Sequence, residues 1–189
     1  MKGDRKQIIL QSLAGLLEER NLSKVTTAVL AEKSGITEAA LYRHFPSKRS
    51  IFSELFGFCD DAIFSECAEI KKSDLNSEEK IKNIFLFFII FLEKNKGFAR
   101  ILSREALSSD EQNVTDAVNQ FFERLELNIK QILTADANKL IAQPGISAQL
   151  IVTLLEGSVS RYIRSKFKEA PSSYSENIWT LAVLATFKD

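Results

Sequence analysis

The sequence has little of several residue types, and each shortage excludes a class of protein. Its 189 residues include two cysteines, one histidine, one methionine and one tryptophan. Cys59 and Cys67, with the single histidine, lack the spacing of a metal site, so no metal or other cofactor is expected. Seven glycines and three prolines are too few for a disordered chain or an all-β fold rich in turns. The sequence has no glycine-rich phosphate loop, and we do not expect an enzyme.

The chain also lacks net charge and long apolar runs. Lysine plus arginine and aspartate plus glutamate each number 25, which excludes a polybasic coat. The longest apolar run, Ile84–Leu92, is under half the roughly 20 residues that a membrane-spanning helix needs. The polar N-terminus resembles no secretion signal, so we expect a cytoplasmic protein without a membrane span. Residues 1–50 nevertheless carry nine basic and five acidic residues, an excess that suits either a phosphate-bearing partner or a solvated surface.

Hydrophobic periodicity predicts an all-α chain. Ile9, Leu13 and Leu16 illustrate the spacing of an amphipathic helix, which we expect to stop near Arg20-Asn21. Pro144-Gly145 is expected to form a loop. The pattern predicts about nine helices, at about 9–20, 26–34, 37–45, 47–72, 76–95, 98–107, 111–138, 147–168 and 175–187.

Residues 25–52 contain the most informative pattern. Two short helices, at about 26–34 and 37–45, are joined by a tight turn that contains Gly35. This is the layout of a helix-turn-helix, whose second helix lies in the major groove of DNA with its N-terminal residues toward the base edges. We expect Gly35 to take a positive φ, and Leu41 and Phe45, four residues apart, to anchor the second helix to its own core.

The small and polar residues of this region have the chemistry of a DNA contact. A small side chain such as Ala39 lets the backbone approach the bases, and hydroxyl, imidazole and ammonium donors suit phosphate oxygens. Ordinary structural roles are also open, because the threonines can be N-caps, Tyr42 a packed surface aromatic and His44 a structural histidine. The candidate DNA-binding residues are Thr26, Thr27, Thr37, Glu38, Ala39, Tyr42, Arg43, His44 and Lys48.

The segment Leu41-Tyr42-Arg43-His44-Phe45-Pro46-Ser47-Lys48 resembles the Leu-Tyr-x-His/Tyr-Phe-x-x-Lys signature of the TetR family of DNA-binding regulators, and the preceding residues 26–36 fit as well. The resemblance implies a helix-turn-helix DNA-binding domain at 1–50 and a helical dimerisation and partner-binding domain at 51–189. It also implies a homodimer, formed through helices at about 147–168 and 175–187, that binds palindromic double-stranded DNA.

Residues 9–14 and 38–48 resemble the nucleoid occlusion members of that family more closely, and so do stretches far outside the DNA-binding region; these are 100–107, 121–126 and 156–168. That resemblance implies a nucleoid-associated protein whose DNA-bound dimers inhibit division-ring assembly through FtsZ. The residues that it implies contact this partner are Phe58, Phe87, Lys94 and Asn95. Glu66 and Ile90 stand where those proteins have a basic residue and a glycine.

The phenylalanine-rich run leaves alternatives open. Nine successive apolar residues cannot all face one stripe of a helix, so the helix is either buried on all sides or lines a groove. In a ligand-responsive repressor, the alternative function, such a helix borders an effector pocket, so a closed apolar cavity would favour a repressor and a filled core the division inhibitor. The apolar stripes of the last two helices suit either a dimer interface or internal packing.

Overall fold

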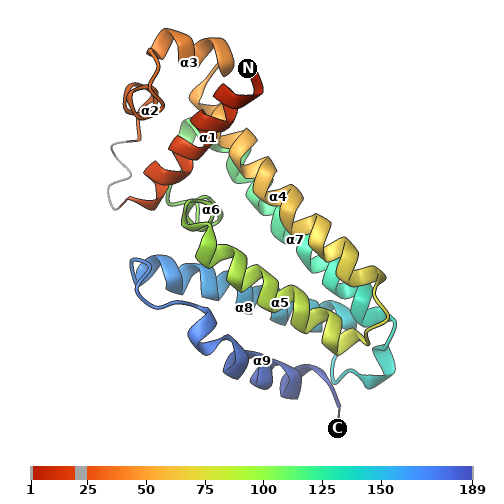
Figure 1. Cartoon of the computed structure of the whole chain (residues 1–189). Helices are drawn as coiled ribbons and strands as arrows, with labels where there is room; N and C mark the ends of the chain where they lie inside the picture. The colour runs from red at the N-terminus through yellow and green to blue at the C-terminus, as the bar shows by residue number, and fades with distance from the viewer. Residues whose placement is uncertain (1, 20–24, 189) are drawn as a thin grey trace. The chain divides into compact units, whose positions relative to one another are not determined.

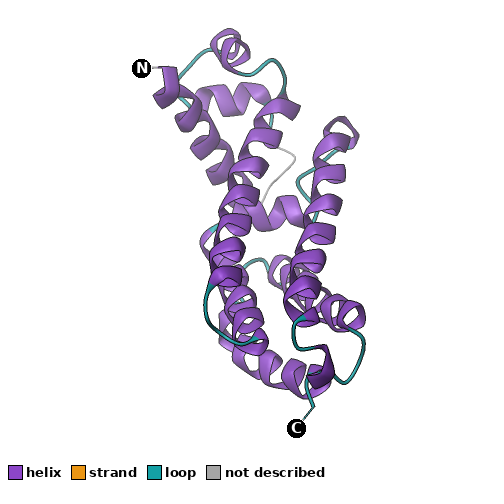
Figure 2. Ribbon diagram, turned by 90° about the vertical axis from the view of Figure 1, so that its right-hand side faces the viewer, coloured by secondary structure: helices purple, strands orange, loops and turns teal. Residues whose placement is uncertain are grey.

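The computed structural model describes residues 2–19 and 25–188, and these residues form nine α-helices, two short 3-10 turns and no strand (Figures 1 and 2). The all-α prediction is confirmed. Within the described ranges, no helix is both long and apolar enough to cross a membrane. The helices are α1 (Lys2–Glu18), α2 (Thr27–Lys33), α3 (Glu38–His44), α4 (Lys48–Lys72), α5 (Ser77–Lys94), α6 (Lys96–Leu102), α7 (Gln112–Thr134), α8 (Pro144–Arg164) and α9 (Ser172–Thr186).

Local caps determine where several helices begin. At α5, the backbone N–H of Asn76 donates to the Glu79 carboxylate at 3.0 Å, and the backbone N–H of Glu79 donates to the Asn76 side chain at 2.9 Å. This reciprocal pair forms a capping box. At α4, the Ser47 hydroxyl accepts from the backbone N–H of Ser50 at 3.1 Å. These caps satisfy N–H groups that have no partner within the helix.

Other boundaries differ from the sequence prediction. Pro144 begins α8 instead of forming a loop, because proline lacks the N–H that a first helical residue cannot use. Helix α6 begins two residues earlier than predicted and ends at Leu102, shortly before Arg104 takes a φ of 62°. Helix α7 ends at Thr134, not near Asn138. The predicted end of the first helix, near Arg20, lies outside the described residues.

The first of two compact units comprises residues 1–60 and 95–118. Within it, α1 packs against α6, α2 and α3. The approach of α6 to α1 is close: a Cβ on Gly97 would lie 3.0 Å from the Ala14 carbonyl oxygen and 3.2 Å from Leu17 Cβ. The rings of Phe56 and Phe98 pack with their centroids 5.8 Å apart. Helix α1 is therefore the element against which α2, α3 and α6 all pack.

The second unit comprises residues 61–94 and 119–189, and in it α5 packs against α8 and α9. The phenylalanine-rich helix fills its core: the Phe85 ring lies 5.7 Å from that of Trp179, and the Phe88 ring lies 6.2 Å from that of Phe121. Of the apolar run, Ile84, Phe85, Phe88, Ile89 and Leu92 are buried and Ile90 is exposed. The buried residues lie on one face of α5 and Ile90 lies on the opposite face, so the helix is not buried on all sides. A domain boundary after residue 50 stays a prediction.

Candidate nucleic-acid interface

Helices α2 and α3 form the helix-turn-helix pair, and each begins with a threonine cap. The Thr26 hydroxyl accepts from the backbone N–H of Val29 and the Thr37 hydroxyl from that of Ala40, both at 3.2 Å. Gly35, in the turn between them, has a φ of 65°, which a residue with a Cβ rarely adopts. The predicted caps and the predicted positive φ are confirmed.

The two helix starts are also joined directly, because the Thr27 hydroxyl donates a short hydrogen bond to the Glu38 carboxylate. On its inner side, α3 is anchored by Leu41 and Phe45, whose exposed fractions are 0% and 1%. The ammonium of Lys6 lies 4.9 Å from the centroid of the Phe45 ring, a favourable cation–π geometry. The position of α3 is therefore set by buried contacts and by the link to α2.

The outer face of α3 is free of these packing contacts. Ala39, Tyr42 and Arg43 are exposed, and Tyr42 retains 47% of its accessible area. His44 is half-buried. An exposed face with a small side chain, a phenol and a guanidinium matches the residue types that contact bases and phosphates. The nine candidate DNA-binding residues all lie in the first unit, and their contacts with DNA stay a prediction.

Lys48, the predicted phosphate ligand at the start of α4, already has an anionic partner. Its ammonium lies 3.5 Å from Oε1 of Glu111, whose side chain is 1% exposed. Burial alone would raise the pKa of Glu111. Hydrogen bonds from the Ser108 hydroxyl and backbone N–H, with the charge of Lys48, outweigh burial and hold that pKa below its ordinary value. Glu111 is therefore ionised at neutral pH.

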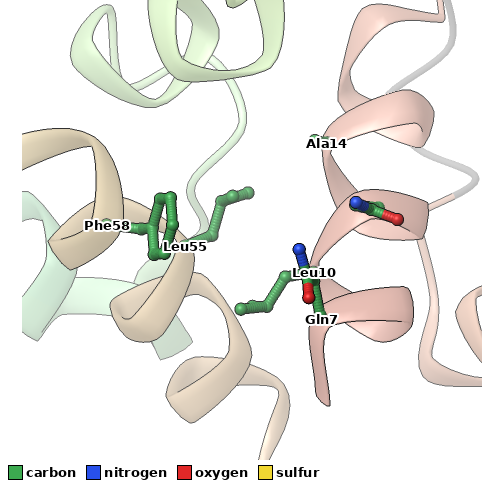
Figure 3. Close-up of a pocket in the computed structure, with 6 residues that line it drawn as sticks. Gln7, Leu10, Ala14, Leu55 and Phe58 are labelled. Atoms are coloured by element: carbon green, nitrogen blue, oxygen red, sulfur yellow. The ribbon is translucent and has the colours of Figure 1, made fainter. Parts of the chain in front are cut away.

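A second feature of the first unit is an apolar groove between α1 and α4. Figure 3 shows Gln7, Leu10 and Ala14 along α1, and Leu55 and Phe58 on α4. The groove has a volume of about 150 Å³, and Phe58 retains 73% of its accessible area. A phenylalanine this exposed beside an open apolar groove is typical of a surface that binds another molecule.

Comparison with known proteins agrees with these features. Residues 9–55 match the family model described as bacterial regulatory proteins of the tetR family, and residues 76–185 match the tetracyclin repressor-like C-terminal domain of SlmA-like type. The nucleoid occlusion factor SlmA of Vibrio vulnificus (strain YJ016) is 37% identical over 185 residues, which cover 95% of this chain and 94% of that protein. SlmA of Marinobacter nauticus is 35% identical over 184 residues, with 95% and 94% covered.

The chain belongs to the SlmA family of TetR-type regulators. Solved structures share this fold at lower identity. The SmeT–triclosan complex has a TM-score of 0.81 at 15% identity and covers 98% of this chain and 93% of its own. Native NalD, the secondary repressor of the MexAB-OprM multidrug efflux pump in Pseudomonas aeruginosa, has a TM-score of 0.79 at 18% identity and covers 100% of both chains.

The other residues that the SlmA resemblance singles out are distributed over both units. Asn95 lies with Phe58 in the first unit, whereas Phe87 and Lys94 lie on α5 in the second. Phe87 is half-buried and its ring lies 5.9 Å from that of Phe91, while Lys94 is exposed. Their contact with a partner stays a prediction.

Helices α8 and α9 of this SlmA-family chain present an open apolar groove. It has a volume of about 210 Å³, and Leu181 within it is 67% exposed. The stripe residues of the two predicted terminal helices line it; they are Leu150, Leu154, Ile178, Leu181, Ala182 and Ala185. Part of the apolar stripe predicted for the last two helices thus lies at the surface of the unit. The rest of the stripe, including Ile151 and Leu155, is buried within the unit.

Sequence reasoning missed Glu111 and the residues that form the groove with Phe58. Ser108 and Glu111 are three apart and form a capping box, so the Ser-x-x-Glu pattern was a usable signal for a helix start. It gave no indication that Lys48 would be the partner of Glu111. The pairing of Leu10 with Phe58 has no local signal at all, because it depends on how α1 packs against α4.

Proposed function

We propose that this chain binds palindromic DNA as a homodimer and, when bound to DNA, inhibits assembly of the division ring through FtsZ. The DNA-binding part of this proposal is supported by the outer face of α3, where Ala39, Tyr42 and Arg43 are exposed. Leu41 and Phe45 anchor the opposite face of this helix in the core. The relationship to SlmA proteins over 95% of the chain supports the nucleoid occlusion half.

In this proposal α3 enters the major groove. Thr37, Glu38 and Ala39 at its first turn face base edges, while Tyr42, Arg43 and His44 face the phosphate backbone. The starts of α2 and α4, at Thr26-Thr27 and Ser47-Lys48, add backbone N–H groups that suit phosphate oxygens. A palindrome presents the same half-site twice, about 34–36 Å apart or a multiple of it, so two copies of the helix pair are needed.

The dimer supplies those two copies. The open groove between α8 and α9 supports this part of the proposal, because an exposed apolar surface formed by two long helices is stabilised when the same surface of a second copy covers it. The interface then comprises helices α8 and α9 of both copies, close to the predicted ranges 147–168 and 175–187. A dimer bound at chromosomal palindromes is associated with the nucleoid.

The groove beside Phe58, with Asn95, is the proposed contact with FtsZ in the first unit. In the second unit the proposed contact residues are Phe87 and Lys94 of α5. An apolar groove with an exposed aromatic at its edge suits a short peptide segment whose apolar side chains insert between two helices. The polar side chains of Gln7 and Gln11 at the same groove can hydrogen-bond the backbone of such a segment.

The alternative, a ligand-responsive repressor, has less support. One solved relative of this fold, FadR of Bacillus subtilis, was determined with stearoyl-CoA, at 15% identity to this chain. In this chain the core side of α5 is occupied by aromatic rings, with Phe85 against Trp179 and Phe88 against Phe121. A core filled in this way favours the division inhibitor over a lipophilic-effector pocket at this place.

The test measures FtsZ assembly by light scattering and sedimentation with the protein alone, with a palindromic duplex alone, and with both. We expect inhibition that is much stronger with both. Phe58→Ala and Lys94→Ala should each lose most of this inhibition and keep DNA affinity. Ile141→Ala, which truncates another exposed apolar side chain (56% exposed), is the matched control and should behave as the parent protein.

Two results would count against the proposal. Inhibition that does not depend on the duplex would refute the coupling to DNA. Loss of DNA binding together with FtsZ inhibition in the Phe58 or Lys94 variant would show that the two surfaces are not separable, and the assignment of these residues would be wrong.

A further inference from the structure

Three contacts join the start of α4 to the segment 108–113, which leads into α7. The Lys48 ammonium lies 3.5 Å from Glu111 Oε1. The Arg49 Nε donates to the Asp110 carbonyl oxygen at 2.7 Å. The Asn113 side-chain amide donates to the Ser53 hydroxyl at 2.9 Å. All of these residues belong to the first unit, which also carries the helix-turn-helix.

The two carboxylate oxygens of Glu111 have different partners. Oε2 accepts from the Ser108 hydroxyl and, at 2.9 Å, from the Ser108 backbone N–H, which closes the capping box before α7. Oε1 faces Lys48. Among the described residues, Lys48 is the only basic side chain paired with this carboxylate. Because a buried carboxylate is costly without a cation beside it, Glu111 attracts the Lys48 ammonium strongly.

A DNA phosphate must compete for the same ammonium. The side chain of Lys48 is 33% exposed, whereas that of Glu111 is 1% exposed, so DNA can reach the lysine but not the carboxylate. An ammonium that neutralises Glu111 contributes less than a full positive charge to a phosphate and releases less counterion when it binds one. Lysine, a compact charge on a flexible stem, can move between two anions.

We propose that Glu111 is a positioning residue that restrains Lys48 and thereby limits DNA affinity. Binding to the phosphate backbone draws Lys48 partly away from Glu111, so the contact between α4 and the start of α7 loosens when DNA binds. The inference rests on the proposed DNA binding through Lys48. Glu111, an acidic residue remote from the helix-turn-helix in sequence, then sets how tightly the helix-turn-helix binds DNA.

The test is a double-mutant cycle on the full chain with Glu111→Gln, Lys48→Ala and the double variant. Glutamine also serves in a capping box, so the substitution removes the charge and keeps the hydrogen bonds to Ser108. Affinity for a fluorescein-labelled duplex of random sequence is measured by anisotropy from about 50 to about 200 mM salt. Glu105→Gln, at an exposed acidic residue of the same unit, is the control for the change in net charge.

We expect Glu111→Gln to bind about three- to ten-fold more tightly than Glu105→Gln, with a salt dependence steeper by up to about 0.9. In the Lys48→Ala background the same substitution should have no such effect. Equal or weaker binding by Glu111→Gln, or a gain that persists without Lys48, would overturn the inference. If the parent protein does not bind the duplex at all, the proposed function fails instead.

A second measurement uses the parent protein and so does not depend on how a variant folds. The carboxyl carbon resonance of Glu111 is followed by NMR in protein labelled with carbon-13 glutamate as the same duplex is added. We expect it to shift as Lys48 moves away, while that of the exposed Glu105 stays in place. An unmoved Glu111 resonance at saturating duplex would contradict the inference.

Discussion

Replacing Leu181 by glutamate tests the dimer that palindrome recognition requires. The side chain is 67% exposed in the single chain and lines the α8–α9 groove. The substitution therefore leaves no cavity, and the stability of the isolated fold should change by no more than about 0.5 kcal/mol. In a two-fold dimer through this groove, each copy buries the exposed two thirds of one Leu181. Because full burial of a leucine side chain contributes about 1.5–3 kcal/mol, each copy contributes about 1–2 kcal/mol.

The two-fold axis doubles that contribution to about 2–4 kcal/mol for the dimer. Because each 1.4 kcal/mol is a factor of ten, the dimer dissociation constant should rise by roughly one and a half to three orders of magnitude. The burial of an unpaired carboxylate adds to this loss. Sedimentation equilibrium over a wide range of protein concentration measures the constant, and urea unfolding of the same samples reports the stability of the fold.

Leu127→Glu on α7 is the matched control, since Leu127 is 51% exposed and lies outside the groove. It should remain dimeric. A dimer through this groove is refuted if Leu181→Glu dimerises as tightly as the parent protein, or if the parent protein is itself monomeric at the concentrations at which it binds a palindrome.

Three further predictions concern the first unit. Leu41→Ala, at a fully buried position, should lower the free energy of unfolding in urea by about 2–5 kcal/mol. Tyr42→Ala should weaken binding to every DNA sequence, with a salt dependence shallower by up to about 1 and unchanged stability; undiminished affinity in a gel-shift titration would contradict the placement of α3. The folded pKa of Glu111 lies below its unfolded value of about 4.3, so its ionised form stabilises the fold above that pH, and this stabilisation is lost as the pH falls through the folded pKa. Glu111→Gln should lack this part of the acid dependence in urea titrations between about pH 6 and pH 3.

The features that the sequence predicted well are local ones. The cap of α3 by Thr37 and the positive φ of Gly35 were predictable, because each depends only on residues within four positions in the chain. Periodicity also predicted the helix at about 111–138, and its apolar stripe, which includes Val118, Leu125 and Ile129, is buried because these residues share one face.

The features that it did not predict depend on contacts between distant residues or on ambiguous local signals. The dipeptide Pro144-Gly145 is compatible both with a loop and with the first turn of a helix. It forms the first turn of α8 because the residues that follow pack as a helix. Arg49 and Asp110, which hydrogen-bond beside the Lys48–Glu111 pair, are 61 positions apart. The partner of Lys48 is therefore decided by tertiary structure alone.

A map of the sites that this protein occupies on the chromosome of its own host distinguishes nucleoid occlusion from local repression. Chromatin immunoprecipitation with sequencing provides it. Nucleoid occlusion predicts many palindromic sites dispersed over much of the chromosome, a large share of them outside promoters, and reduced occupancy at all of them in the Tyr42→Ala variant. One or two sites beside the protein's own gene would contradict nucleoid occlusion and would indicate a local repressor.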